Sequence, residues 1–356
     1  MNKLCKITLL VSTVLIFSGC TDKNEYEATR LGFAERPAVH LTAREIEPYE
    51  PVVDIQLTFI GDCTLATQMG ANSEGTFNWY AENYEKEYFF EKLYPYTSKD
   101  DFSIANCENV FTDDALPEAY KGYTPAFWFR SPSKNAEIYQ AGDVEVVTVA
   151  NNHTYDYNEE GMNDTIKAIE SVEGLQWGGT DKDVILEKDG VKIGLICDTM
   201  WGPWELDKIT ERLEKLNEST DIQVVYFHGG EEAVHTEEDW KVECCHELAE
   251  VGADLIVGAH PHVLQPMETY KGVHIVYSIG NFCFGGNTFP ENRTIVFQET
   301  FSFDRDSKKI VGRNENIIPF YVFTGNINNF QPAPIDDEVI AKQVTGFMYR
   351  KTNSLF

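Results

Sequence analysis

Basic residues are scarce in this sequence. Its 356 residues include 29 lysines and arginines against 58 aspartates and glutamates, which gives a formal net charge of −29. A deficit of this size argues strongly against general nucleic-acid binding, which depends on basic side chains that displace phosphate counterions. It also argues against docking on anionic lipid through a basic patch. The charge is typical of a soluble, solvent-facing protein and says nothing about the fold.

Cysteine pairs with CxxC spacing are also lacking. Six of the eight cysteines lie in the body of the chain, and none forms a CxxC pair: Cys63, Cys107, Cys197, Cys244, Cys245 and Cys283. This argues against a zinc knuckle or a thioredoxin-like motif. Most of the six end apolar runs, where a free cysteine commonly behaves as a small hydrophobe. Disulfides are conceivable in an exported protein, but the sequence does not pair the cysteines.

The N-terminal apolar run, residues 7–17, is too short to span a bilayer as a mature helix. It follows Lys3 and Lys6 and fits the hydrophobic region of a secretory signal. The small residues before Cys20 resemble the lipobox of bacterial lipoproteins, which implies cleavage before this cysteine and a lipid on its thiol. We therefore predict a signal peptide over 1–19, a lipidated Cys20, a flexible tether over 20–51 and an extracytoplasmic protein attached to the cell membrane. An ordinary signal peptide with an incidental cysteine is the alternative.

After residue 51 the sequence has no internal repeat and no low-complexity linker. Apolar runs predict strands, and three stretches between them predict helices. This alternation indicates an α/β fold, with one domain over 52–330 and a C-terminal extension over 331–356. The strands are expected at 54–60, 102–105, 144–150, 192–197, 222–227, 255–258, 274–278, 294–303 and 318–324, and the helices at 133–141, 161–172 and 237–251.

Five of the predicted strands are followed at once by a polar residue that can bind a metal or transfer a proton. Such side chains meet at the carboxyl edge of an α/β sheet, where these folds build their sites. Five polar strand ends are hard to explain as packing, because each is costly to bury without a partner. The segments that follow the strands are Gly61-Asp62, Asn106-Cys107-Glu108, Asn151-Asn152-His153, His228-Gly229-Gly230 and Ala259-His260-Pro261-His262.

Carboxylate, carboxamide and imidazole together suit a borderline divalent cation such as Mn²⁺, Fe²⁺ or Zn²⁺. No thiolate belongs to the set, which fits a catalytic site better than a structural zinc site. His260 and His262 flank a single residue, so each imidazole could face a different ion of a pair. We therefore predict one or two divalent ions at this edge.

These segments, in this order, resemble the CapA family of poly-γ-glutamate capsule biosynthesis proteins, which is related to calcineurin-like metallophosphoesterases. The resemblance covers about residues 54–285 and implies a four-layer α/β/β/α sandwich. It also implies a role in making, anchoring or exporting an anionic γ-linked glutamate polymer, with the polymer or its synthase subunits as partners. Further matching segments are Phe129-Arg130-Ser131-Pro132, Glu231-Glu232 and Tyr277-Ser278-Ile279-Gly280-Asn281.

The resemblance also assigns roles to individual residues. Asp62 and His262 match ligands of a first metal, and Glu108 matches a bridging carboxylate. The expected ligands of a second metal are Asn152, His228 and His260.

His153 matches a catalytic histidine that gives a proton to a leaving group, and Glu232 matches a glutamate that supports the ligands. Asp156 could orient His153 or cap the following helix, and capping is the favoured interpretation. Arg130 is a candidate for holding a carboxylate or phosphate. Asn281 could also face the site.

The chain departs from the metallophosphoesterase pattern at one position. Thr64 stands where these enzymes usually carry a histidine that completes the first metal, and a hydroxyl is a poor ligand beside an imidazole. The first ion is therefore expected to bind weakly or not at all. Two hypotheses follow: a metal-dependent hydrolase or transferase acting on a phosphorylated or γ-glutamyl substrate, or a non-catalytic polymer- or synthase-binding subunit with a vestigial metal site.

Residues outside these motifs receive simpler interpretations. His40, His235, His246 and His274 are expected on the surface or as satisfied core residues. The aromatic segment 201–204 could line a cleft, but packing in the core is the favoured interpretation.

Overall fold

A computed structural model describes residues 50–288 and 291–356. The predicted signal peptide, Cys20, His40 and nearly all of the predicted tether lie outside the described residues, so those predictions stay as they are. Within the described ranges, no helix combines the length and the apolar character needed to cross a membrane.

The first of two large sheets contains the strand that begins the described chain. Its strand order is β16-β15-β14-β1-β3-β6-β7, and β1, β3, β6 and β7 run parallel. The strands are β1 (Val52–Cys63), β3 (Phe102–Cys107), β6 (Val146–Thr148), β7 (Gln176–Gly178), β14 (Arg293–Asp304), β15 (Lys309–Tyr321) and β16 (Ala333–Pro334).

The second large sheet has the order β12-β13-β11-β10-β9-β8. Its central strands are parallel, and its two edge strands pair antiparallel. The strands are β8 (Val184–Lys188), β9 (Val191–Thr199), β10 (Ile222–His228), β11 (Leu255–Ala259), β12 (Leu264–Tyr270) and β13 (Val273–Ile279).

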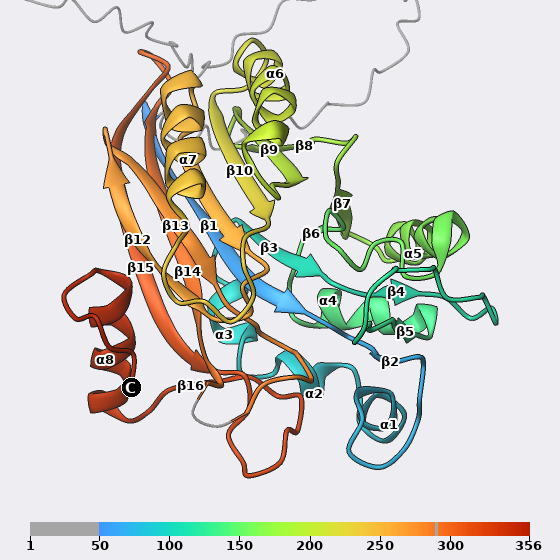
Figure 1. The fold of residues 1–356 in the computed structure, drawn as a ribbon. Coiled ribbons are helices and arrows are strands. Elements are labelled where there is room, and N and C mark those ends of the chain that lie inside the picture. Colours follow the sequence, from blue (N-terminus) through green and yellow to red (C-terminus); the bar gives the residue numbers. More distant parts are fainter. Residues whose placement is uncertain (1–49, 289–290) are drawn as a thin grey trace, which may run out of the picture. The chain divides into compact units, whose positions relative to one another are not determined.

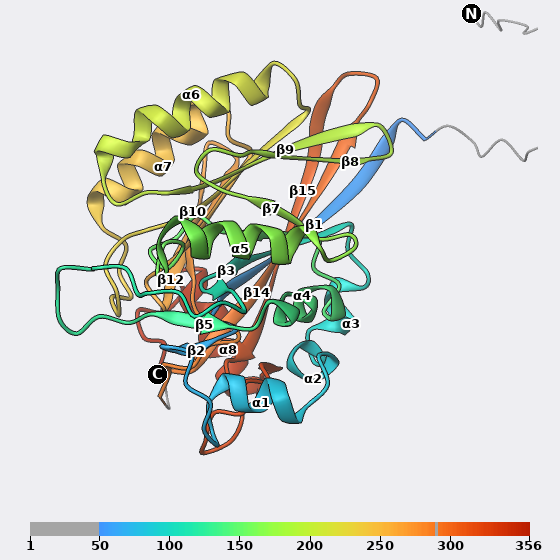
Figure 2. The same ribbon diagram turned by 90° about the vertical axis from the view of Figure 1, so that its right-hand side faces the viewer.

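Side chains on the inner and outer faces of the two sheets belong to different hydrophobic clusters. Leu57 and Phe59 of β1 share one cluster with Val224 and Tyr226 of β10, so that the two sheets pack face to face. The burial of these apolar side chains is the main stabilising contribution in such a sandwich. On the outer face of the second sheet, Ile196 and Val225 face α6 and α7, which lie side by side (Figure 2). The helices are α6 (Leu206–Asn217) and α7 (Asp239–Val251).

Five helices cover the outer face of the first sheet. Ala105 and Val147 belong to a third cluster that includes Phe77, Phe89 and Ile169 from three helices. The predicted four-layer α/β/β/α architecture is therefore confirmed (Figure 1). The helices on this face are α1 (Phe77–Asn83), α2 (Glu87–Phe90), α3 (Tyr94–Thr97), α4 (Glu137–Ala141) and α5 (Asn158–Glu170).

Two smaller features complete the fold. A three-stranded sheet joins β2 (Thr67–Gln68), β5 (Phe129–Ser131) and β4 (Val110–Phe111). Near the C-terminus, α8 (Glu338–Met348) contributes Val344 and Phe347 to the core between the two large sheets.

Every strand predicted from an apolar run lies within or overlaps an observed strand, and each of the three predicted helices overlaps a helix. Among the elements that the sequence reasoning missed are β7, β8, β12, β16, α6, α8 and the three-stranded sheet. The six cysteines of the body are all buried and free, which confirms their interpretation as small hydrophobes.

Gly61 shows how the two sheets meet at the site. A Cβ at this position would lie 1.9 Å from the carbonyl oxygen of Gly280, so only glycine lets β1 approach the end of β13 this closely. The amide of Asp62 donates to that same carbonyl oxygen at 3.1 Å, and the Phe282 amide donates to the Asp62 carbonyl at 2.8 Å. The glycine of the Gly-Asp segment therefore serves a close backbone contact between the two sheets.

Candidate metal centre

The carboxyl ends of the parallel strands bring the six predicted metal ligands to one edge of the sandwich. Both large sheets contribute. β1, β3 and β6 position Asp62, Glu108 and Asn152, whereas β10 and β11 position His228, His260 and His262.

Asp62 is fully buried and accepts hydrogen bonds at both oxygens. Asn106 donates to Oδ1 at 2.7 Å, and the backbone amide of His260 donates to Oδ2 at 3.1 Å. His262 Nδ1 lies 3.4 Å from Oδ2. Burial alone raises the pKa of Asp62, but His262 and His228 outweigh it and lower that pKa to about 2. Asp62 is therefore a carboxylate held ready as an anionic ligand.

Glu108 is the most informative residue of the site. Its side chain is fully buried, and its Oε1 atom has no hydrogen-bond partner. Three imidazole nitrogens surround this atom: Nε2 of His262 at 3.8 Å, and Nε2 of His153 and of His228 at 3.9 Å. Burial and the neighbouring Asp62 charge raise the pKa of Glu108 well above its usual range.

These distances fit an ion better than direct bonds. Two donors that each lie about 2.1 Å from one ion are themselves about 3.0–4.2 Å apart. A carboxylate oxygen left without a partner in the interior is costly unless a cation or a donor reaches it. The residues present therefore fit a divalent metal between Glu108 and the surrounding imidazoles.

The predicted ligands of a second metal form a connected group. His228 Nε2 lies 2.9 Å from Asn152 Oδ1 and 3.0 Å from His260 Nδ1. Burial lowers the pKa of His228 well below its usual value and lowers that of His260 to about 3. Both imidazoles are therefore neutral near pH 7, which is the form that binds metals. The indole of Trp201 meets both rings edge-on, so it lines the site and is not packed in the core as we had favoured.

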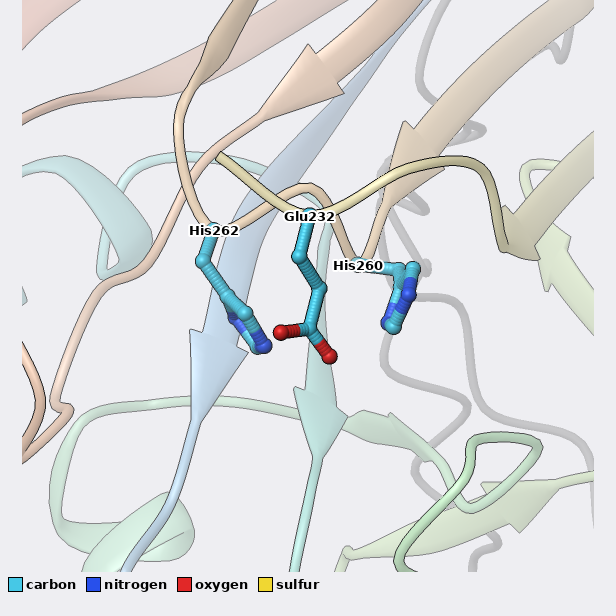
Figure 3. Close-up of side chains that lie close together, drawn as sticks. All are labelled: Glu232, His260 and His262. Atoms are coloured by element: carbon cyan, nitrogen blue, oxygen red, sulfur yellow. The ribbon is translucent and has the colours of Figure 1, made fainter. Parts of the chain in front are cut away.

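Glu232 lies closer to the histidines than a supporting role requires. It comes from the loop after β10, and one ligand atom each of Glu232, His260 and His262 lie within 4.8 Å of one another (Figure 3). Asp62, Glu108 and His228 form a second such group. Glu232 is exposed, so its carboxylate can reach an ion from the solvent side.

The loop after β11 holds its two histidines in an unusual backbone conformation. φ is 97° at His260 and 60° at His262, a region that favours glycine and costs other residues free energy. Strain of this kind persists where the surrounding structure over-determines it, often at functional sites.

His153 is oriented by Asp156. Its Nδ1 lies 2.8 Å from Asp156 Oδ2, and Lys121 forms an ion pair with Oδ1 of the same carboxylate at 2.5 Å. The favoured interpretation of Asp156 as a helix cap is wrong, because α5 begins after Tyr157 without a side-chain cap. A proton on Nδ1 bonded to Asp156 leaves Nε2 of His153 directed at the site, 3.9 Å from Glu108 Oε1.

Of the other residues considered from the sequence, Asn281 lies in the site and Arg130 lies outside it. Asn281 Oδ1 lies 2.8 Å from Nδ1 of His262 and orients that ring. Arg130 instead lines a separate cleft of about 280 Å³, donates to the Asp114 carbonyl at 3.4 Å and lies over the ring of Tyr157. Thr64 is buried and donates to the Glu108 carbonyl at 3.4 Å.

Asn106 and Lys121 are the two residues that sequence reasoning did not single out. The Nδ2 of Asn106 lies within 3.3 Å of Asp62 Oδ1, Glu108 Oε2 and His228 Nδ1, so this one amide connects three predicted ligands. Its position in a strand-end motif was a usable signal. Lys121 comes from the long connection between β4 and β5, where nothing in the sequence marks a contact with Asp156.

Comparison with known proteins places the chain in a family. The family model described as bacterial capsule synthesis protein PGA_cap matches residues 56–286. The PGA biosynthesis protein CapA of Bacillus subtilis is 24% identical over 326 residues, covering 86% of this chain and 75% of that protein. The capsule biosynthesis protein CapA of Bacillus anthracis is 27% identical over 258 residues, covering 65% of this chain and 60% of its own length.

Among solved structures, a phosphatase from Mycoplasma pneumoniae is similar with a TM-score of 0.46 and 16% sequence identity, covering 75% of this chain and 94% of that one. The family match itself spans β1 through the loop after β13 and contains every predicted site residue. The chain belongs to the bacterial capsule synthesis protein PGA_cap family.

Proposed function

We propose that this protein is a metal-dependent hydrolase or transferase that takes part in making, anchoring or exporting a poly-γ-glutamate-like capsule. The observation that carries the catalytic part is the buried Oε1 of Glu108, which has no hydrogen-bond partner and is surrounded by three imidazole nitrogens. The capsule part rests on the family and on the names of its relatives.

The charges around the site support a bound cation. Asp62, Glu108, Glu232 and Asp156 are four acids in one region, and burial keeps His228 and His260 neutral. Lys121 is already paired with Asp156. Asp62, Glu108 and Asp156 are buried, and buried acids are costly without enough counter-charge, which a divalent ion would supply.

The proposed roles follow from the geometry. Asp62, Glu108, Asn152, His228, His260 and His262 would hold Mn²⁺, Fe²⁺ or Zn²⁺. Such an ion polarises a phosphoryl or acyl oxygen and activates water. His153, held by Asp156 at Nδ1, would in its doubly protonated form give the Nε2 proton to the leaving group and remain neutral with its proton on Nδ1.

The two ion positions are not equivalent in this proposal. The Asn152, His228 and His260 group is complete, whereas Thr64 gives its hydroxyl proton to a backbone carbonyl and brings no imidazole to the other position. The second ion is therefore expected to be the tighter one. The alternative function, a non-catalytic subunit that binds polymer or synthase, is favoured by this same threonine.

We further propose that the chain works outside the cytoplasm, attached to the membrane through a lipid on Cys20. This rests on the sequence pattern before that cysteine. It would hold the domain beside the surface where a capsule polymer is handled.

Metal content of the purified chain tests the proposal, measured by plasma mass spectrometry. Wild type is expected to retain Mn, Fe or Zn, and the double variant His260→Ala/His262→Ala is expected to lose it. The matched control is His235→Ala/His246→Ala, because both of these histidines lie outside the site: His235 bonds the Leu264 carbonyl, and His246 pairs with Glu268. Equal metal in the two double variants would overturn the assignment of the ligands.

Turnover is tested separately with His153→Ala. This variant should keep its metal and lose hydrolysis of phosphoesters or γ-glutamyl peptides, together with capsule output in cells. Normal capsule output from His153→Ala would reject the catalytic role and leave the accessory subunit.

A further inference from the structure

A cleft of about 540 Å³ opens beside the candidate metal centre. His153, Glu232, His262 and Asn281 are part of its wall. This volume falls within the roughly 300–1,000 Å³ of small-molecule sites. The cleft is therefore large enough to hold the part of a substrate that lies next to the reacting centre.

Phenylalanines form the apolar part of this wall. The structure places five of them there: Phe77, Phe127, Phe129, Phe284 and Phe330. Two contact the site directly, because the ring of Phe129 lies 4.6 Å from that of His153 and the ring of Phe284 lies 4.9 Å from that of His262, centroid to centroid. The aromatic surface and the proposed catalytic groups thus belong to one continuous wall.

Lysine and arginine are missing from the same wall. None of the described residues that line the cleft is a lysine or an arginine, whereas Glu232 and Glu291 are among them. Arg130 neighbours Phe129 on β5, but successive side chains of a strand point to opposite faces, and Arg130 lines the separate cleft. Lys121 is held by Asp156. A polyanion entering this cleft would meet two carboxylates and no lysine or arginine among the described residues of its wall.

We propose that this cleft takes an uncharged, apolar portion of the substrate, an aryl or alkyl group attached to the phosphoryl or acyl centre, and does not take a bare polyglutamate segment. The inference rests on the proposed function for the position of the reacting centre and adds the class of group that occupies the space beside it. A γ-glutamyl polymer would then reach the site only through a neutral end or a linked acceptor.

Saturation-transfer NMR on the full chain, stripped of metal with EDTA, tests the preference. Benzyl alcohol and γ-glutamylglutamate are the two probes, offered in the same tube. The expected result is a clear signal for benzyl alcohol and a weaker one for the dipeptide. Phe127→Lys should reduce the benzyl alcohol signal by about threefold and raise that of the dipeptide. Phe127 is 45% exposed, so this substitution leaves the core intact.

Tyr120→Ala is the matched control, since Tyr120 lies in the same connection, is 96% exposed and does not line the cleft. It should leave both signals unchanged. A stronger signal for γ-glutamylglutamate in wild type, or a benzyl alcohol signal that Phe127→Lys leaves intact, would overturn the inference.

The experiment is independent of the proposed function because it uses no metal and no turnover. If the metal measurement fails while the NMR preference holds, the cleft is an apolar binding site without the proposed chemistry. If metal and hydrolysis are found but the dipeptide is preferred, the inference about the cleft is wrong and the proposed function stands.

Discussion

Two buried clusters in this protein combine histidine with carboxylates, and they compensate the buried negative charge in different ways. Between the two large sheets, His274 Nδ1 lies 2.7 Å from Glu299 Oε2, and Arg313 lies 3.9 Å from the other oxygen. At the strand ends, Glu108 Oε1 has three imidazoles at 3.8–3.9 Å. Neither this oxygen nor Glu299 Oε1 has a hydrogen-bond partner, but only Glu299 Oε1 lies near a guanidinium. The first cluster balances its charge with its own side chains, whereas the second has acids in excess and space between its donors.

This comparison shows why buried histidine and carboxylate alone do not identify a metal site. His274 was expected on the surface or as a satisfied core residue, and its pairing with Glu299 confirms the core interpretation. What distinguishes the candidate centre is the spacing of its donors and, among the described residues, the lack of a lysine or arginine beside Glu108.

The largest expected difference concerns metal binding. Glu108→Ala should abolish retention of the metal, because it removes the carboxylate that three imidazoles surround, while His274→Ala should leave the metal content unchanged. Plasma mass spectrometry on both variants measures this. Loss of metal in both, or in neither, would remove the distinction between the clusters.

The free energy of unfolding should respond strongly to the change at His274 and little to the change at Glu108. His274→Ala leaves Glu299 buried without its closest partner and should lower the free energy of unfolding by about 3 kcal/mol. In metal-free protein, Glu108→Gln replaces a carboxyl group whose pKa burial and Asp62 already raise, so it should leave stability unchanged or raise it by about 1 kcal/mol. Urea denaturation in EDTA measures both, and a large loss of stability in Glu108→Gln would contradict the excess of negative charge.

Restoring the missing imidazole sharpens the comparison within the site itself. Thr64→His should strengthen binding of the first ion by about tenfold, as expected for replacing a poor ligand with a good one. Thr64→Ser is the control, since it keeps the hydroxyl that bonds the Glu108 carbonyl. Titration with Zn²⁺ by calorimetry would show a second binding step only in Thr64→His, and its appearance in wild type would mean that Thr64 does not weaken the first position.

The smallest effect is a pH dependence of the His274 cluster. Burial alone lowers the pKa of His274, but the Glu299 carboxylate outweighs it and raises that pKa above the usual value. The pKa of the unfolded chain is near 6.5, and below this pH the protonated His274 stabilises the fold in full. This contribution is lost as the pH rises through the higher pKa of His274 in the folded protein. The stability difference between wild type and His274→Gln should therefore shrink as the pH rises above about 6.5. A difference that grew with pH would reverse the sign of this pairing.

Much of this arrangement could be predicted from the sequence, because apolar runs mark buried strands and their ends mark one edge of a sheet. Asp62, Glu108, His228, His260 and His262 were all placed in this way. Asp156 was misjudged because an aspartate just before a helix gives the same local signal whether it caps that helix or orients a histidine three residues earlier. The tertiary contact with Phe129, whose amide donates to Asp156 at 2.7 Å, decides between the two.

Arg130 and Lys121 show two different limits. The alternation of side chains along a strand places Phe129 and Arg130 on opposite faces, so only one of them can face the site. The sequence does not indicate which of the two it is. Lys121 lies in a connection whose path is set by long-range contacts, including the Ala119 amide to the Asp156 carbonyl at 2.8 Å. No local pattern encodes such a path.

The close approach of Gly61 to Gly280 has a consequence for how the protein comes apart. It joins the end of β1 to the end of β13, and thus one sheet to the other, through backbone hydrogen bonds at the site itself. The first sheet carries three of the proposed ligands and the second sheet carries the other three. Any partial opening that separates the sheets therefore also breaks the ion-binding site. The amides of Asp62 and Phe282 should therefore exchange with deuterium only when the entire domain unfolds, and a bound ion should slow them more than amides at the far ends of the strands.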